Sequence, residues 1–271
     1  PQGVNPNSVW NPGMASDARG GIDFNGANAI GGKYTTRPDM GDKPVNYVSW
    51  FDAARVANWL HNGQGAGSTE TGAYTLNNAT SGDAPAVNPG ALFFIPTEDE
   101  WYKAAYYKGG GTNAGFWYYA TQSDNGPAVV TANATGDGSA GGTGNFANFG
   151  GAAGNVTTVG TNGGPSAYGT FDMSGNVHEW YDWGYASSVI GGRGGHFGDC
   201  CAYFVSSFNN NSYAPSVEAS VIGFRLASSF TAPVPEVDPA GLGSVLALVT
   251  CVLGLVERLR PMPGWRPRNE R

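Results

Sequence analysis

The fold is decided around residues 171–180, which read Phe-Asp-Met-Ser-Gly-Asn-Val-His-Glu-Trp. Two carboxylates stand near the ends of this stretch, at Asp172 and Glu179, and the main-chain carbonyls of Gly175 and Val177 lie between them. Carboxylate and carbonyl oxygens are the ligands that Ca²⁺ prefers. We expect no regular hydrogen-bonded structure in this loop, so a cation would offset the repulsion between the carboxylates. The stretch predicts either a calcium site or a capped turn that leads into a core tryptophan.

The region before this stretch is too rich in glycine for regular structure. Glycine supplies 17 of the 62 residues from Gly109 to Thr170. A connection of that length in a compact domain is usually functional or pinned by ions and side chains. Short apolar runs separated by Gly, Asn and Thr predict brief strands at residues 92–95, 116–119, 156–159 and 224–227.

Two amphipathic helices are predicted farther upstream. Ser49 and Asp52 form a capping pattern before apolar residues at helical spacing, which continue to about residue 62. Thr97 and Glu100 form a second capping pattern, before a helix that we expect to end near residue 107. Two helices among short strands indicate an α+β fold.

The composition suits such a domain. The 271 residues include 43 glycines and 17 prolines, and only 13% are charged, which excludes a coiled coil or a helical repeat. Hydrophobic residues make up 41% of the chain, too many for outright disorder. The net charge is −7. Because an acidic surface repels phosphate, we expect no nucleic-acid partner.

The C-terminal part of the sequence predicts a membrane anchor. Residues 231–238 form a Pro-rich spacer, and an uncharged apolar run within residues 239–257 is long enough for a transmembrane helix. A basic tail at 258–271 follows, which is typical of the cytoplasmic side. We therefore expect residues 1–230 to form a domain outside the inner membrane. A buried core helix is the alternative for the apolar run.

Five blocks of the sequence, taken in order, resemble the formylglycine-generating enzyme family, also called the sulfatase-modifying factor domain. They are Pro44-Val-Asn-Tyr-Val-Ser-Trp50, Ile95-Pro-Thr-Glu-Asp-Glu-Trp-Tyr-Lys-Ala-Ala105, the stretch 171–180, Arg193-Gly-Gly195 and Gly223-Phe-Arg-Leu-Ala227. The resemblance covers about residues 40–228. It implies an irregular variant of the C-type-lectin fold with two main helices and short antiparallel strands. The family's opening strand and helix have no counterpart, so we expect a fragment of a longer precursor.

The resemblance implies a copper-dependent cysteine oxidase, but the chain departs from the family at both copper ligands. In the family two cysteine thiolates hold the copper, and their positions correspond here to Asp199 and Phe204. Cys200 and Cys201 lie beside the first position, and adjacent thiolates do not offer the linear geometry that Cu(I) prefers. These two cysteines are therefore weak candidates for catalysis, and we do not expect copper.

The histidines leave a different metal arrangement open. His178 and His196, with Glu179 or Asp199, contain the two imidazoles and one carboxylate of a facial triad. The sequence does not show that these side chains converge. A packed ring at His178 and a partner of the helix dipole at His61 are the alternatives.

The resemblance also implies calcium. In the family the stretch discussed first is a calcium site, and a second site begins at a pair like Asn148 and Phe149. The later ligands of that second site have no counterpart in residues 150–160, so we expect it to be incomplete. The first site implies one structural calcium ion, with ligands at Asp172, Gly175, Val177 and Glu179.

The loop at residues 196–217 is a candidate ligand-binding surface. Every residue in it could be encoded by a codon ending in C, which adenine-targeted diversification would leave, and some C-type-lectin-fold proteins vary their ligand binding in this way. Chance is the alternative origin of the pattern. The candidate ligand-binding side chains are His196, Asp199, Tyr203, Phe208 and Tyr213.

Residues 233–260 resemble the PEP-CTERM sorting signal, by which exported bacterial proteins are held in the membrane, cut by an exosortase and passed to the cell surface. The residues that carry the resemblance are Pro235, Glu236, Arg258 and Arg260, while Val237 replaces a second proline of the usual signal. The resemblance implies export, contact with the membrane through the C-terminal helix, and an exosortase-type partner.

Together these features predict an exported, surface-anchored domain that does not perform the family's oxidation. We expect a calcium-stabilised module that binds an extracellular ligand or presents a surface. The alternatives are an active oxidase that uses another metal arrangement, and a diversified ligand-binding protein with a variable loop at 196–217.

Overall fold

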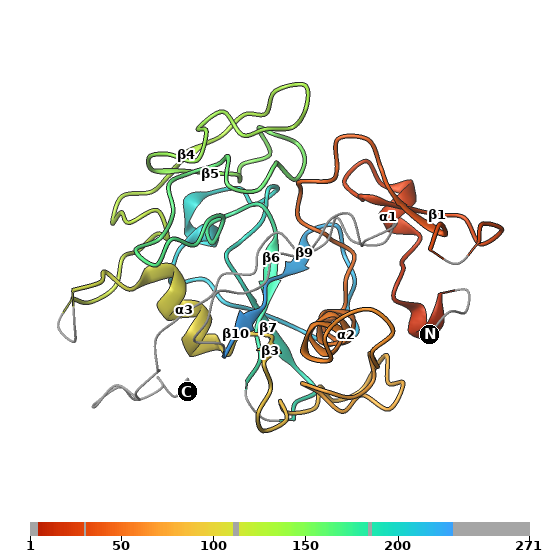
Figure 1. Cartoon of the computed structure of the whole chain (residues 1–271). Coiled ribbons are helices and arrows are strands. Elements are labelled where there is room, and N and C mark those ends of the chain that lie inside the picture. The colour runs from red at the N-terminus through yellow and green to blue at the C-terminus, as the bar shows by residue number, and fades with distance from the viewer. Residues whose placement is uncertain (1–4, 30, 111–113, 184–185, 230–271) are drawn as a thin grey trace.

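The computed structural model describes residues 5–29, 31–110, 114–183 and 186–229 (Figure 1). The predicted spacer, membrane helix and basic tail lie outside these residues, as do all four residues of the predicted sorting signal. Within the described ranges, no helix is both long enough and apolar enough to cross a bilayer. The described residues form a mixed α/β domain with few helices.

Two helices carry most of the helical structure, and both begin at the predicted capping patterns. Helix α2 spans Trp50–His61 and helix α3 spans Glu98–Tyr106. At the start of α2 the Ser49 hydroxyl accepts the Asp52 N–H, while the Asp52 carboxylate accepts the Ser49 N–H. At the start of α3 the Thr97 hydroxyl accepts the Glu100 N–H, and the Glu100 carboxylate accepts the Thr97 N–H. Each capping box satisfies backbone donors that a helix start leaves unpaired, and this fixes where the helices begin.

The other helical segments are single turns. They are η1 (Pro6–Ser8), α1 (Gly13–Ser16) and η2 (Ala202–Val205).

The main sheet has four strands in the order β8-β7-β6-β9. Their bounds are β6 His178–Trp180, β7 Ile190–Arg193, β8 Asn211–Tyr213 and β9 Ile222–Phe224. Strand β7 pairs antiparallel with β6 and with β8, but β6 pairs parallel with β9. The expectation of antiparallel strands alone is therefore wrong. Parallel neighbours need a long connection, and the chain between β6 and β9 provides it.

Three smaller strand pairs surround this sheet. They are β1 (Ile22–Phe24) with β2 (Tyr34–Thr36), β3 (Phe93–Phe94) with β10 (Ala227–Ser228), and β4 (Ala128–Val129) with β5 (Phe146–Ala147), the last pair being parallel. Of the predicted strands, those at 92–95 and 224–227 contribute to ladders. The run at 116–119 forms isolated bridges, and the run at 156–159 forms no strand.

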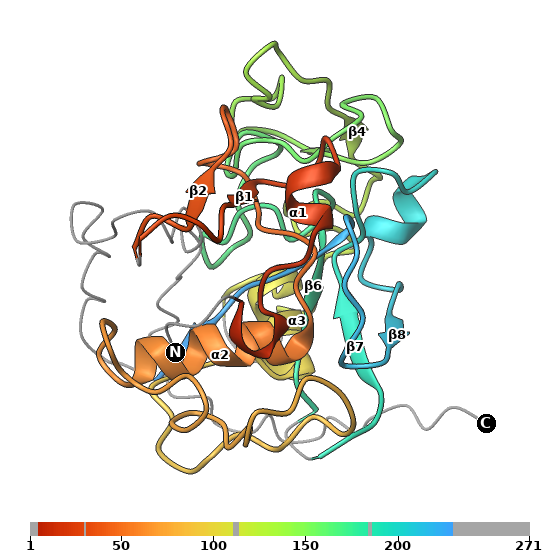
Figure 2. The same ribbon diagram turned by 90° about the vertical axis from the view of Figure 1, so that its right-hand side faces the viewer.

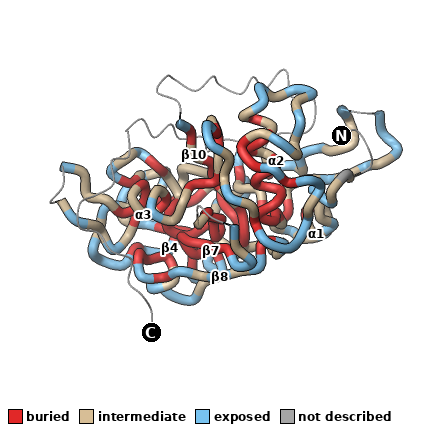
Figure 3. Tube along the Cα trace, turned by 90° about the horizontal axis from the view of Figure 1, so that it is seen from below, coloured by how far each residue is buried: buried red, intermediate tan, exposed pale blue. Residues whose placement is uncertain are grey.

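The core lies between the two main helices and the central strands (Figure 1). Helix α2 packs its apolar face into a cluster that includes Trp180 and Ile190, whereas Trp101 and Tyr106 of α3 pack against Met173. Figure 3 shows the buried residues gathered in the middle of the domain, with exposed loops around them. The Gly-rich loops, drawn green in Figure 2, lie beyond one end of β6 and β7. Their described residues contain the short strands β4 and β5 and no helix.

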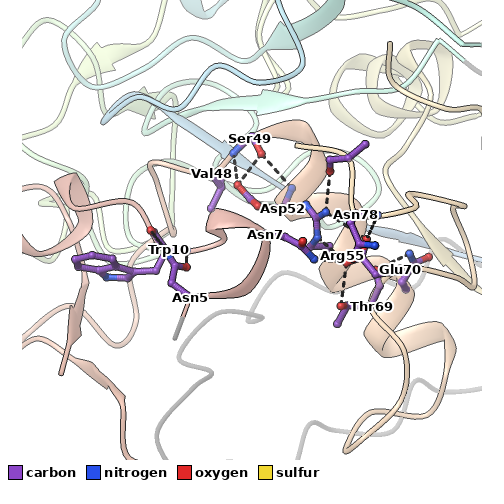
Figure 4. A network of polar contacts seen from close by, with 12 residues as sticks. Asn5, Asn7, Trp10, Val48, Ser49, Asp52, Arg55, Thr69, Glu70 and Asn78 are labelled. Atoms are coloured by element: carbon purple, nitrogen blue, oxygen red, sulfur yellow. Dashed lines mark hydrogen bonds and ion pairs between the residues drawn. The ribbon is translucent and has the colours of Figure 1, made fainter. Parts of the chain in front are cut away.

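A buried polar network ties α2 to the loop that follows it (Figure 4). Arg55 of α2 donates Nε–H to Glu70 over 2.9 Å and an Nη2–H to the Ala79 carbonyl over 2.7 Å. Glu70 also accepts the Asn78 N–H over 2.9 Å. Arg55 therefore joins two turns of the loop to α2, in a segment that has no helix or strand to hold it.

Candidate functional site

Strand β6 places His178 and Glu179 on opposite faces of the main sheet, because successive strand residues point to opposite sides. The ring of Tyr213 on β8 lies 6.0 Å from that of His178 and 5.7 Å from that of Trp180. Glu179 instead accepts a hydrogen bond of 2.7 Å from Nε1 of Trp101 on α3. The candidate site therefore has two sides, which contain different polar clusters.

On the α3 side, the buried carboxylate of Glu179 is paired with Arg225. Nε and Nη2 of Arg225 donate to the two carboxylate oxygens, the second over 2.5 Å, and Nη2 also donates to the Phe171 carbonyl over 3.1 Å. A buried ion pair is tolerated when its geometry is bidentate and further hydrogen bonds satisfy it. Arg225 thus balances the charge of Glu179. We call Glu179, Arg225 and Trp101 the glutamate cluster.

Asp172 lies near this cluster with its own partners. Its two carboxylate oxygens accept the Gly160 N–H over 2.6 Å and the Asn162 amide over 2.7 Å. Its φ of 58° is in the left-handed region. Burial raises the pKa of Asp172, and the nearby charge of Glu179 acts in the same direction.

Residues 172–177 form no helix or strand, as expected, and β6 begins at His178. Single hydrogen bonds to distant residues nevertheless hold the loop. The Gly175 N–H donates to the Gly194 carbonyl over 2.6 Å, and the Asn176 N–H donates to the Asn148 carbonyl over 2.9 Å. These partners come from other parts of the chain, so the local sequence does not indicate them. Calcium at Asp172, Gly175, Val177 and Glu179 stays a prediction, but repulsion between the carboxylates is no longer a reason for it.

The residues of the second predicted calcium site are buried. The Asn148 amide donates to the Asn155 carbonyl over 2.9 Å and to Thr157 over 3.0 Å. Phe149 packs against Ala147. Both residues therefore contribute to the packing of the Gly-rich region, and a calcium ion there stays a prediction.

On the opposite side of the sheet, three predicted ligands converge. His178, His196 and Asp199 each offer one ligand atom, and these atoms lie within 4.8 Å of one another. The two imidazole rings are 5.0 Å apart, and Nε2 of His196 is 3.2 Å from Oδ1 of Asp199. We call these residues the histidine cluster. The carboxylate that joins the histidines is that of Asp199, while Glu179 faces the other way.

The hydrogen bonds of the cluster assign the proton on His196. Nδ1 of His196 accepts the Gly198 N–H over 3.0 Å, so a neutral ring carries its proton on Nε2, toward Asp199. Oδ2 of Asp199 accepts the His196 backbone N–H over 2.7 Å. Burial lowers the pKa of His196, which favours the neutral ring.

His178 is the most buried member of the cluster, with 3% of its surface exposed. Its Nε2 lies 3.4 Å from the Asn211 amide, and its Nδ1 has no partner of normal hydrogen-bond geometry among the described residues. Burial, followed by the charge of His196, lowers the pKa of His178 to about 3, against an opposing contact with the Arg193 backbone. The ring is therefore neutral at physiological pH and one nitrogen is unsatisfied.

The predicted binding residues of the loop separate into two groups. Tyr213 lies beside the histidine cluster, but Tyr203 and Phe208 point outward, with exposed fractions of 56% and 63%. The ring of Phe208 lies 5.0 Å from that of Tyr118, which is itself 48% exposed. The loop thus presents aromatic surface outside the cluster.

The cysteines follow Asp199 in the chain but are not members of either cluster, and the third histidine lies at the end of α2. Cys200 and Cys201 are exposed, with their sulfurs 3.6 Å apart, and Asp199 occupies the position that matches the first copper ligand. These residues do not fit a copper ion held by two enclosed thiolates. His61 ends α2, where its Nδ1 accepts the Leu92 N–H over 3.0 Å.

Sequence reasoning gave no role to two buried arginines that organise the site. Arg225 completes the glutamate cluster, and Arg193 pairs with Glu98 at the start of α3 and donates to the Asn209 carbonyl over 3.0 Å. Both arginines lie in blocks quoted for the resemblance. An arginine flanked by glycine and core residues is the signal that could have found them, because a buried charge needs a partner.

A family model described as the sulfatase-modifying factor enzyme 1-like domain, FGE-sulfatase, matches residues 19–230. The chain belongs to this family. The match covers more than half of the chain and begins before residue 40, where the sequence resemblance begins. Membership fixes the domain type, while the site described above differs from the copper arrangement that the resemblance implies.

Three solved structures are similar to this chain. Treponema denticola variable protein 1 is 23% identical, with 75% of each chain covered and a TM-score of 0.46. CarF is 27% identical, with 69% of this chain and 68% of its own covered and a TM-score of 0.43. PvdO from Pseudomonas aeruginosa is 21% identical, with 82% and 76% covered and a TM-score of 0.40. Comparison with curated proteins finds no match.

Proposed function

We propose that this sulfatase-modifying-factor domain is a binding module for a peptide or protein ligand outside the cell and does not oxidise cysteine. The observation that carries the proposal is the aromatic surface of the loop 196–217, where Tyr203 and Phe208 are more than half exposed. Aromatic residues are enriched at protein interfaces, where a few of them carry much of the binding energy.

The composition of the loop supports recognition of a protein surface. Beside its exposed aromatic residues the loop exposes Asn210 and Ser212, whereas Ser206, Ser207 and Asn209 are buried. Tyr, Ser and Asn are also enriched in antibody loops, where rigid aromatic rings supply contact area and small polar side chains supply adaptable hydrogen bonds. The acidic net charge of the chain favours a ligand that is neutral or basic.

The positions of Cys200 and Cys201 support the proposal that the protein does not oxidise cysteine. Two exposed neighbouring thiols lie outside both buried clusters, and the first copper position carries a carboxylate hydrogen-bonded within its own loop. We expect no aldehyde in a Cys-x-Pro-x-Arg peptide incubated with the protein, copper and oxygen, by mass spectrometry. A copper-dependent member of the family serves as the positive control. Aldehyde formed by this protein would refute this part of the proposal.

Binding is tested with the full-length protein and a library of random peptides displayed on phage. We expect enriched peptides to bind the unmodified protein at least about tenfold more tightly than the Tyr203→Ala/Phe208→Ala variant, because hot-spot aromatic residues each contribute about 2 kcal/mol or more. Val189→Ala is the matched control, since Val189 is 46% exposed but lies outside the loop. Peptides that bind the loop variant as well as the unmodified protein would contradict the proposal.

Export, surface anchoring and calcium belong to the same proposal. The Pro-rich spacer, apolar run and basic tail support an anchor with the domain outside the inner membrane. Protease added to intact spheroplasts should then digest the domain. Protection of the domain, with digestion only after lysis, would place it on the inner side and contradict this part.

A further inference from the structure

We propose that His178, His196 and Asp199 bind a divalent transition-metal ion, such as zinc. The proposal goes beyond the peptide-binding function and does not depend on it. It starts from the convergence of three ligand atoms within 4.8 Å of one another, one from strand β6 and two from the loop that begins at residue 196. Two imidazoles and one carboxylate form a donor set that suits zinc, iron, nickel or copper rather than calcium.

The spacing of two ligand atoms already fits one metal ion. Ligand atoms about 2.1 Å from a tetrahedral zinc ion lie about 3.4 Å from one another. Nε2 of His196 and Oδ1 of Asp199 are 3.2 Å apart. The ligand atom of His178 lies within 4.8 Å of both, so small side-chain rotations would complete the set.

The state of His178 provides an independent reason. The ring is 3% exposed, and its Nδ1 lacks a partner of normal hydrogen-bond geometry among the described residues. A buried polar atom without a partner costs about 1–3 kcal/mol. Neutral imidazole is also the form that binds metals. The cluster therefore contains a buried imidazole whose Nδ1 has no hydrogen-bond partner of normal geometry within the described part of the chain.

The backbone conformation at Gly195 allows the Asp199 carboxylate to lie close to His196. Gly195 has a φ of 72°, and a Cβ at this position would lie 2.9 Å from Oδ2 of Asp199 and 2.7 Å from the Phe204 carbonyl oxygen. Any other residue would be strained here and would push these groups apart. Glycine thus permits the turn that brings Asp199 back to His196.

Metal binding requires one rearrangement. When Nε2 of His196 binds the ion, the ring proton must move to Nδ1, so Gly198 has to withdraw its N–H. Gly198 is exposed and water can replace the lost bond, at a cost of about 1 kcal/mol. Micromolar binding supplies about 8 kcal/mol, so this cost does not prevent it.

The test measures zinc binding to the purified full-length protein by calorimetry. Millimolar calcium and magnesium are present, so that other carboxylate sites are occupied. We expect one equivalent to bind with a micromolar or lower dissociation constant. His196→Asn and Asp199→Asn should each weaken binding at least tenfold, since both positions are only half-buried and the substitutions keep a polar side chain. Thermal melts without metal establish that each variant folds.

Two controls locate the ion. Cys200→Ser/Cys201→Ser removes the exposed thiols, and His61→Gln removes the histidine outside the cluster. Both should bind zinc as the unmodified protein does. With Co²⁺ as the probe, we expect ligand-field absorption in the visible range without a sulfur charge-transfer band. The proposal would be overturned if the unmodified protein did not bind zinc, or if the His196 and Asp199 variants bound it as tightly as the unmodified protein does. Loss of zinc binding in either control variant would also overturn it.

Discussion

The two polar clusters of β6 begin at neighbouring residues but differ in how their polar atoms are satisfied. The Glu179 carboxylate receives hydrogen bonds from Arg225 and Trp101 on the α3 side. On the other side, Nδ1 of His178 has no partner of normal hydrogen-bond geometry among the described residues, and Nε2 of His196 lies 3.2 Å from Oδ1 of Asp199. A buried carboxylate paired with an arginine stabilises a fold, whereas two imidazoles beside a carboxylate can bind a ligand.

The difference follows from the residues that each side can recruit. The α3 side receives an arginine from the segment between β9 and β10, close to the sheet. The other side is covered by the loop 196–217, which supplies an imidazole and a carboxylate but no cation to this cluster among the described residues. The comparison therefore predicts that damage to the glutamate cluster affects stability first, while damage to the histidine cluster affects binding and acid sensitivity.

The largest effect is expected from Arg225→Leu. Removal of the guanidinium leaves Glu179 buried without its cation, which costs about 3–5 kcal/mol of unfolding free energy. The double variant Glu179→Gln/Arg225→Leu should recover much of this loss, because the unpaired charge is gone. Urea denaturation of the single and double variants measures both. A loss below about 1 kcal/mol in the single variant would mean that the ion pair does not stabilise this side.

The second-largest expected effect is a loss of unfolding free energy at low pH, caused by His178. The folded-state pKa of His178 is about 3, below its unfolded value of 6.5, so the unfolded chain binds the extra proton first as pH falls. The contribution of the neutral His178 ring to the unfolding free energy is therefore fully present above pH 6.5. It decreases as the pH falls from 6.5 to 3. At pH 4.5 the loss is about 3 kcal/mol. The groups that face the ring are His196, Asp199 and Tyr213.

His178→Phe removes this proton uptake and keeps a ring in the site. Its unfolding free energy, measured in urea with metal ions chelated, should therefore depend less on pH between 6.5 and 4.5 than that of the unmodified protein. Parallel pH profiles for the two proteins would show that the ring is not held neutral, and the contrast between the clusters would weaken.

The smallest effect is expected from calcium at residues 172–179. For a site with a dissociation constant near those of extracellular modules, millimolar calcium adds about 1 kcal/mol, or a few degrees of melting temperature, relative to excess chelator. Glu179→Gln is unsuitable as a test because it also breaks the ion pair with Arg225. Asp172→Asn is better, since asparagine tolerates the φ of 58° at this position.

We expect Asp172→Asn to lose the calcium response. Its melting temperature in chelator should also fall, because an amide cannot accept both the Gly160 N–H and the Asn162 amide. A response that persists in the variant would place the calcium ion elsewhere. Identical melts of the unmodified protein with calcium and with chelator would show that hydrogen bonds and Arg225 hold this loop without a cation.

The sequence was most informative where structure depends on neighbours along the chain. The capping boxes at Ser49 and Thr97 located both main helices, because a capping box uses residues only three positions apart. The order of the motif blocks predicted the family that the family match confirms. The parallel pairing of β6 with β9 was not predicted, since short strands carry little information about their partners.

The sequence by itself determined the helices, the domain family and the absence of cysteine from the two copper positions, because these follow from local hydrogen bonding or from residue identity. Only the tertiary structure decided that Arg225 pairs with Glu179 and that Asp199, not Glu179, joins the two histidines. Both outcomes depend on which strands pair and which face each residue takes. Contacts between residues distant in the sequence, such as the pairs of β6 with β7 and β9, fix these choices, and no local pattern encodes them.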